Sequence, residues 1–164
     1  MKAYLLDNTT VRMAQKAGIL ITLLTIALTP RALAFLGGSE DSVQDDQALL
    51  EAKVRTTTAA AYRIHELTSP LGILVREYVS QAGVVFAVSW QGPFQPDMKQ
   101  ILGSYFVEYS LGAKEEREGR VRRSPLNIYR HSLVFQSAGH MRANFGRAYD
   151  PRLLPPGVNA DELR

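Results

Sequence analysis

Two turns of the same form, each joining stretches rich in β-branched and aromatic residues, constrain the fold more than any other feature of the sequence. The turns occupy residues 69–72 and 80–83, and both have the form Ser-x-x-Gly. Serine suits the first position of a type I turn, and the following glycine takes a positive φ without a Cβ clash. The pattern predicts an antiparallel meander of three strands, at residues 62–67, 73–79 and 84–90.

The turns also predict the register of these strands, because Ser69 then pairs with Ile73 and Ser80 with Val84. Opposite charges and aromatic side chains would face each other across the strands: Glu66 with Arg76, His65 with Glu77, Tyr78 with Phe86, and Leu74 with Trp90. Such pairs stabilise a sheet by about 0.2–1 kcal/mol each, and a slip of one residue would lose all of them.

In this register one face of the meander is aromatic, and we expect it to be the core face. It carries Tyr62, Ile64, Leu74, Tyr78, Phe86, Val88 and Trp90. The opposite face combines an apolar strip with polar side chains. It carries Val75, Val79, Val85 and Ala87 together with Arg63, His65, Glu77 and Ser89.

An amphipathic helix is predicted after the meander. Its apolar side chains recur with a 3.6-residue period, at Met98, Ile101, Leu102, Tyr105, Phe106 and Tyr109. Pro96 and Asp97 suit its first turn, and Gly112 suits its end. Gly103, inside the helix, costs about 1 kcal/mol relative to alanine, which indicates that another part of the chain approaches it closely. We expect the apolar stripe to pack on the aromatic face of the sheet.

Two further elements complete the predicted fold. A helix capped by Ser39 or Ser42 is expected to run to about Val54, with an acidic first turn that lacks the spacing of a calcium loop. Strands at residues 126–136 and 141–149 predict a hairpin with a three-residue loop, residues 138–140, and Gly139 at positive φ. This loop would place five apolar side chains on one face: Leu133, Phe135, Met141, Ala143 and Phe145.

The predicted fold class is therefore α+β, a single domain with one antiparallel sheet of about five strands and two helices packed on the sheet. The order is helix, three-stranded meander, helix and hairpin. Residues 150–164 contain three prolines and a glycine, and they predict an irregular C-terminal arm.

The first 34 residues have the features of a cleavable signal peptide. An apolar run at residues 17–28 is followed by Ala32-Leu33-Ala34, an A-x-A cleavage site. The run is too short to span a bilayer comfortably, although a buried helix or a signal anchor would share its composition. The stretch before the run is long and acidic at Asp7, so Met1 and Met13 both stay open as the start. We expect an exported domain at residues 35–164, periplasmic or secreted.

Removing the predicted signal leaves an electrically neutral domain. The signal holds four of the 19 basic and one of the 16 acidic residues, so 15 of each remain. A neutral domain is not attracted electrostatically to nucleic acid or to an anionic membrane. The absence of cysteine excludes disulfides and a lipidated cysteine, so we expect no stable membrane anchor.

One polar group in the predicted register has catalytic residue types. His65 lies opposite Glu77, with Arg63 and Ser89 on the same face, and a histidine–carboxylate–serine set is able to support general base chemistry. A cross-strand ion pair explains the same residues, and no nucleophile motif such as G-x-S-x-G is present. A periplasmic hydrolase using His65 and Glu77 is therefore the alternative function, and whether the protein is an enzyme stays open.

No spacing in the sequence predicts a metal or a cofactor. His65, His131 and His140 are not paired at ligand spacing, and cysteine ligands are absent. A glycine-rich phosphate loop is also missing. We therefore expect neither a metal site nor a cofactor.

The main functional hypothesis is a small soluble binding module without catalytic activity. If the central helix covers one face of the sheet, the other face exposes Val75, Val79 and Val85 beside Arg63, which is the composition of an interaction patch. Phe94, in a loop between two prolines, is a further candidate anchor. We expect the partner to be a protein or a cell-envelope polymer. If other parts of the chain cover this face, the argument for the patch fails.

Several segments carry a family resemblance. They are residues 77–93, with Glu-Tyr-Val-Ser-x-Ala-Gly-Val-Val-Phe-Ala-Val-Ser-Trp-x-Gly-Pro, then Pro96-Asp97, residues 102–106, residues 36–38 and residues 146–149. Together they resemble DUF2844, an uncharacterised family of small exported bacterial proteins, over essentially the whole chain after the signal. The resemblance implies export. It implies no activity, ligand or catalytic residue, because the family has none assigned.

If the signal is cleaved as predicted, the mature protein begins at Phe35, because signal peptidase cuts after the A-x-A motif. Intact-mass spectrometry of the exported protein measures this directly. A full-length chain retained in the membrane fraction would contradict the prediction.

Overall fold

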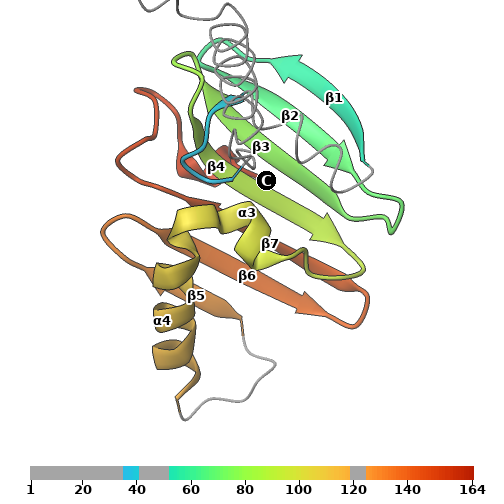
Figure 1. Cartoon of the computed structure of the whole chain (residues 1–164), viewed down its shortest axis with the longest axis vertical. Coiled ribbons are helices and arrows are strands. Elements are labelled where there is room, and N and C mark those ends of the chain that lie inside the picture. The colour runs from blue at the N-terminus through green and yellow to red at the C-terminus, as the bar shows by residue number, and fades with distance from the viewer. Residues whose placement is uncertain (1–34, 41–51, 119–124) are drawn as a thin grey trace, which may run out of the picture. The chain divides into compact units, whose positions relative to one another are not determined.

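The computed structural model describes residues 35–40, 52–118 and 125–164. The chain divides into two units, residues 1–31 and 32–164, and every described residue belongs to the second. In this part of the chain seven strands form one antiparallel sheet in the order β1-β2-β3-β4-β7-β6-β5 (Figure 1). The strands are β1 (Lys53–Thr58), β2 (Tyr62–Thr68), β3 (Leu74–Ser80), β4 (Val85–Gly92), β5 (Leu126–Tyr129), β6 (Val134–His140) and β7 (Ala143–Tyr149).

The fold is α+β, but the predicted layout of about five strands and two helices is wrong. Among the described residues, α-helix occurs between β4 and β5 alone. Lys53 and Val54, expected at the end of an N-terminal helix, belong to β1, where a run of threonines favours a strand. Residues 41–51 of that predicted helix lie outside the described residues. The predicted fourth strand is two strands, because a turn closed by the Arg130 N–H and the Leu133 carbonyl interrupts it.

The register predicted between β2 and β3 is confirmed. His65 lies opposite Glu77, and Glu66 lies opposite Arg76. The Arg76 Nε atom donates to Glu66 Oε1 at 2.8 Å. The turn between the strands has Gly72 at a φ of 77°, as its Ser-x-x-Gly form predicts.

The register predicted between β3 and β4 holds only next to the turn. Val79 lies opposite Val85, but Tyr78 lies opposite Ala87, so Phe86 is an additional residue in β4. This is a β-bulge, in which two residues of one strand face one residue of its partner. The predicted pairing of Tyr78 with Phe86 is therefore wrong.

The bulge reverses the faces of the rest of β4. Val88 and Trp90 were predicted on the aromatic face, but they lie in the core on the opposite face, together with Val75. Leu74 correspondingly lies opposite Gln91 rather than Trp90. A sequence pattern that assumes uninterrupted alternation cannot show this change.

Different parts of the chain cover the two faces of the sheet. The helices and residues 35–40 pack on the face that carries Val79 and Trp90 (Figure 1). The aromatic face, with Phe86, packs against the C-terminal arm through the buried Leu163. The expectation that the helix packs on the aromatic face is therefore wrong.

The helix between β4 and β5 is interrupted where Gly103 approaches another segment. It consists of α3 (Met98–Leu102), the 3-10 turn η2 (Gly103–Tyr105) and α4 (Phe106–Arg117). Gly103 has a φ of 52°, and a Cβ atom there would lie 2.2 Å from Phe35 Cδ2. The close approach predicted at Gly103 is confirmed. Gly112, expected at the helix end, lies inside α4, where a Cβ would be 2.5 Å from Ile128 Cγ2 of β5.

The hairpin of β6 and β7 has a two-residue loop, Met141-Arg142, and not the predicted three-residue loop. Arg142, rather than Gly139, has the positive φ, of 62°. Phe135 is consequently in the core, whereas Phe145 is 55% exposed. The expectation that the apolar side chains of this hairpin share one face is therefore wrong.

Replacing Gly103 with alanine should destabilise the protein by about 2–5 kcal/mol. The substitution adds a clash with Phe35 to the strain of a side chain at positive φ. Urea unfolding followed by Trp90 fluorescence measures the loss. Gly83→Ala is the matched control, because Gly83 also has a positive φ but nothing lies within 4 Å of its Cβ position, so about 1–2 kcal/mol is expected.

The addition of Phe35→Ala to the Gly103→Ala variant should restore part of the lost stability. Equal losses for Gly103→Ala and Gly83→Ala, with no recovery in the double variant, would show that Phe35 does not restrict this position.

Candidate functional site

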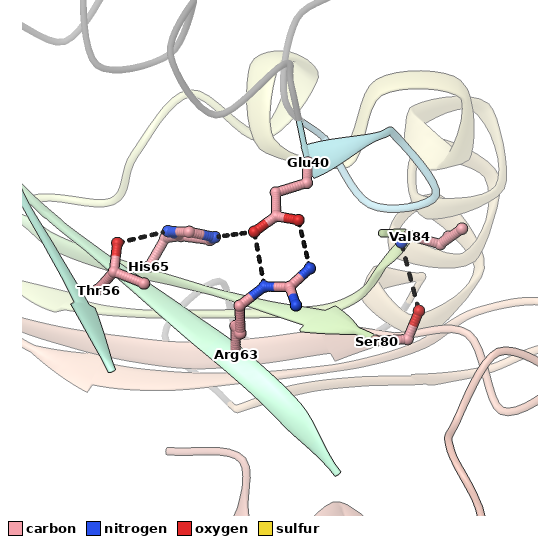
Figure 2. A network of polar contacts seen from close by, with 6 residues as sticks. All are labelled: Glu40, Thr56, Arg63, His65, Ser80 and Val84. Atoms are coloured by element: carbon pink, nitrogen blue, oxygen red, sulfur yellow. Dashed lines mark hydrogen bonds and ion pairs between the residues drawn. The ribbon is translucent and has the colours of Figure 1, made fainter. Parts of the chain in front are cut away.

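His65 lies at the centre of a polar network on the helix-covered face of the sheet (Figure 2). Thr56 Oγ1 is 2.9 Å from His65 Nδ1, and His65 Nε2 is 3.1 Å from Glu40 Oε1. Arg63 Nε donates to Glu40 Oε1 at 2.7 Å, and Arg63 Nη2 donates to Glu40 Oε2. His65 is 8% exposed, whereas Thr56 is exposed at the edge strand.

Three segments of backbone bring the network together. Thr56 of β1 and His65 of β2 are cross-strand partners. Arg63 is two residues before His65 in β2, so its side chain projects from the same face. Glu40 comes from the segment before the strands, and its N–H donates to the Gly83 carbonyl at 2.9 Å. The network therefore joins the N-terminal segment to the first two strands.

The contacts define the chemistry of the network. A carboxylate only accepts hydrogen bonds, so the contact with Glu40 places the proton of a neutral His65 ring on Nε2, while Nδ1 accepts from the Thr56 hydroxyl. The hydrogen bonds from Arg63 lower the pKa of Glu40 below its usual 4.5; burial opposes this, and the bond from His65 adds to it. Glu40 is therefore a charged acceptor at neutral pH.

The order hydroxyl, imidazole and carboxylate is shared with the catalytic triads of hydrolases. Here, however, Arg63 donates to both oxygens of Glu40. In addition, none of the residues of the network lines any of four grooves in the described part of the chain. Glu77 lies opposite His65 in the register and is 1% exposed, but the carboxylate that hydrogen-bonds the imidazole is Glu40. The geometry favours a structural ion-pair network over a substrate site.

The residues predicted to form a binding patch are mostly buried. Val75, Val79 and Val85 lie in the core under the helices and the N-terminal segment, so the strip that they form is not accessible in this structure. Arg63 belongs to the network of His65. Phe94 is the exception, because 56% of it is exposed in the loop between β4 and α3.

A different surface of the sheet is open. We call it the outer face, the side of β5, β6 and β7 that points away from α4. In β5, Leu126 and Ile128 are buried against the core, whereas Asn127 and Tyr129 are exposed on the outer face. Tyr129 is 68% exposed. Large aromatic side chains therefore project from regular strands into solvent on this side.

A groove of about 690 Å³ lies on the outer face beside the C-terminal arm. Gln136 and Phe145 line its strand side, and Asp161 and Leu163 line its arm side. Arg147 connects the two sides: its Nε donates to Gln136 Oε1 at 2.7 Å, and its Nη2 donates to Asp161 Oδ1 at 3.1 Å. The charge of Arg147 is thus balanced within the protein.

The outer face was not predicted from the sequence, because the predicted three-residue loop placed Phe145 on the same face as Leu133 and Phe135. The wrong loop length in the hairpin reversed the faces of β7, as described above. The alternation of apolar and polar residues from Leu126 to Tyr129 was the available signal, since such alternation is typical of a strand with one solvated face.

The described residues contain no group of three or more His, Cys, Asp or Glu side chains that could hold a metal ion. His131 and His140 are both exposed, His131 in the bend between β5 and β6 and His140 at the end of β6. In the same part of the chain, no helix has the length and apolar character needed to cross a membrane.

Comparison with known proteins returns one family. The family described as "Protein of unknown function (DUF2844)" matches residues 32–163. No curated protein and no solved structure matches the chain significantly.

Replacing Glu40 with glutamine should lower the free energy of unfolding by about 1–3 kcal/mol at about pH 7, because charge-assisted hydrogen bonds are lost. The folded-state pKa of Glu40 is lowered, so its contribution is fully present above the usual value of 4.5 and is lost as the pH falls through the folded value. The difference between wild type and variant should therefore shrink at about pH 3.5. Urea unfolding at both pH values measures it.

Glu115→Gln is the control for this prediction. Glu115 also forms an ion pair with an arginine, but its side chain is 66% exposed, so a change below about 0.5 kcal/mol is expected. A loss for Glu40→Gln that is no larger than the loss for Glu115→Gln would show that the network does not stabilise the fold.

Proposed function

We propose that the chain, which belongs to the DUF2844 family of proteins of unknown function, is an exported binding module whose ligand lies on the outer face of β5, β6 and β7. In this proposal the module has no catalytic activity, and its partner is a polymer of the cell envelope. Export, to the periplasm or the exterior, rests on the predicted signal. The family match begins at residue 32, beside the predicted cleavage point, which supports this division.

The exposure of Tyr129 and Phe145 on regular strands is the observation that carries the proposal. These side chains are 68% and 55% exposed. Phe145 lines the groove, and the Tyr129 hydroxyl accepts a hydrogen bond from Gln136, which also lines it. A large aromatic side chain left in water forgoes about 1.5–3 kcal/mol of burial free energy. Exposed aromatic side chains beside a concave surface are typical of binding sites, because the ligand then supplies that burial.

The outer face is also rigid. Its strands are held from behind by the buried Leu126, Ile128, Phe135 and Ala148, which belong to the main core. The positions of the exposed side chains are therefore set before a ligand arrives. Such preorganisation reduces the entropy lost on binding.

A polymer suits this surface better than a small enclosed ligand. The groove is open to solvent along the sheet, and its lining runs from Pro125 through Gln136 to the arm at Asp161. The domain after the predicted signal is neutral, so neither nucleic acid nor an anionic membrane is favoured. An uncharged or mixed-charge chain in the envelope remains as the class that fits.

A hydrolase based on His65 is the second candidate, and the order Thr56, His65, Glu40 is the observation that favours it. In that case His65→Ala would abolish hydrolysis of a substrate while leaving polymer binding intact. In a binding module, the same substitution would change stability and leave ligand affinity unchanged.

Phe145→Ala should remove most of the binding of the purified protein to insoluble cell-envelope material. Cosedimentation with washed envelope fragments from the producing cells measures the bound fraction. Phe94→Ala is the matched control, because Phe94 is 56% exposed, nearly the same as Phe145, but lies in a loop outside the groove. We expect Phe94→Ala to bind like wild type. Equal binding by wild type and Phe145→Ala would refute the proposed site, and a loss in Phe94→Ala alone would move it to that loop.

A further inference from the structure

The outer face has a regular chemical pattern across its three strands. Asn127, Gln136 and Arg147 lie opposite one another in β5, β6 and β7, so they form a polar row across the sheet. The next row on this face, two residues along the strands in one direction, contains Phe145 and Ala138. The next row in the other direction includes Tyr129 and Tyr149. A polar row is therefore flanked by a row with an aromatic side chain on each side.

The polar row offers hydrogen bonds but little net charge. Arg147 is the cation in the row, and its guanidinium already donates to Gln136, to the Ala160 carbonyl and to Asp161. A ligand anion would have to compete with these acceptors. The polar row therefore does not attract a charged ligand electrostatically.

The remaining groups suit hydroxyl-bearing ligands. Amides such as Asn127 both donate and accept, and so does the Tyr129 hydroxyl, which accepts from Gln136 Nε2 at 2.9 Å. A sugar hydroxyl also donates and accepts, so it complements these groups without a charge. The C–H groups on one face of a sugar ring are apolar and pack on an aromatic ring such as Phe145.

Resting on the proposed function, we infer that the ligand on the outer face is an uncharged carbohydrate chain. Its rings pack on Phe145 at one end and on Tyr129 at the other, and its hydroxyls bind Asn127 and Gln136 between them.

The spacing of the rows requires a chain of several sugars. Residues two apart on one face of a strand are about 7 Å apart, so the row of Phe145 is about 13 Å from the row of Tyr129 along the strands. A single sugar ring cannot reach both aromatic side chains. Affinity should therefore increase from a monosaccharide to an oligosaccharide of the same sugar.

An extended peptide fits this surface less well. A peptide that adds to a sheet does so at an edge, where unpaired backbone groups meet its own. On the outer face the backbone groups of β6 are already paired with β5 and β7. A peptide lying there would leave its amides without partners, which is unfavourable on a buried surface.

The test uses the purified protein and a panel of defined probes in titrations followed by NMR. The probes are neutral hexasaccharides (β-1,4-glucan, β-1,3-glucan and β-1,4-linked N-acetylglucosamine), their monosaccharides, a heparin hexasaccharide and an unstructured peptide. We expect at least one neutral hexasaccharide to bind, to bind more tightly than its monosaccharide, and to shift the amide signals of Asn127 and Phe145.

Variants then locate the binding. Phe145→Ala should weaken the affinity for that hexasaccharide about tenfold or more, as truncation of a central aromatic contact usually does. Asn127→Ala should weaken it as well. Phe94→Ala should leave it unchanged. The thermal midpoint of each variant serves as the folding control, since all three side chains are exposed.

The outcomes separate the ligand class from the proposed function. If only heparin or only the peptide binds, and Phe145→Ala abolishes that binding, the inference of an uncharged carbohydrate is overturned while the binding function of the outer face stands. If a probe binds without dependence on Phe145, or if no probe binds, both are overturned.

Discussion

A single additional residue in β4 governs how the sheet is enclosed. Because Phe86 and Ala87 both lie opposite Tyr78, the strand changes phase, and Val88 and Trp90 turn toward α3 and α4. The first six residues of β4 are buried, and the strand pairs with both β3 and β7. The register of β4 therefore decides on which side of the sheet its large side chains lie. The helices cover the face on which Val88 and Trp90 lie, and the C-terminal arm covers the face on which Phe86 lies.

The outer face also depends on the register of β4. Trp90 lies so close to β7 that a Cβ at Gly146 would be 2.3 Å from the indole ring, so β7 presents no side chain to the core at that position. Its neighbours Phe145 and Arg147 point the other way, onto the outer face. The packing of Trp90 against Gly146 on the core side of β7 and the exposure of Phe145 on its outer side thus follow from the same alternation of side chains along the strand.

The two polar features of the domain have opposite characters. The network of His65 is closed: both ring nitrogens and both carboxylate oxygens of Glu40 are engaged by Thr56 and Arg63 or by each other. It stabilises the attachment of the N-terminal segment. The outer face is open and backed by core side chains, so its exposed groups are available and fixed in position. Binding therefore fits the outer face better than catalysis fits the network.

By itself the sequence determined the α+β class, the meander, the register of β2 and β3, and the close approach at Gly103. These depend on turn geometry and on interactions between residues near in the chain. The tertiary structure alone decided the bulge at Phe86, the two-residue loop with Arg142 at positive φ, and with them the outer face and the pairing of His65 with Glu40. A non-glycine residue at positive φ is locally unfavourable, so no local pattern predicts it; it is offset by the burial of distant side chains, which requires the assembled sheet.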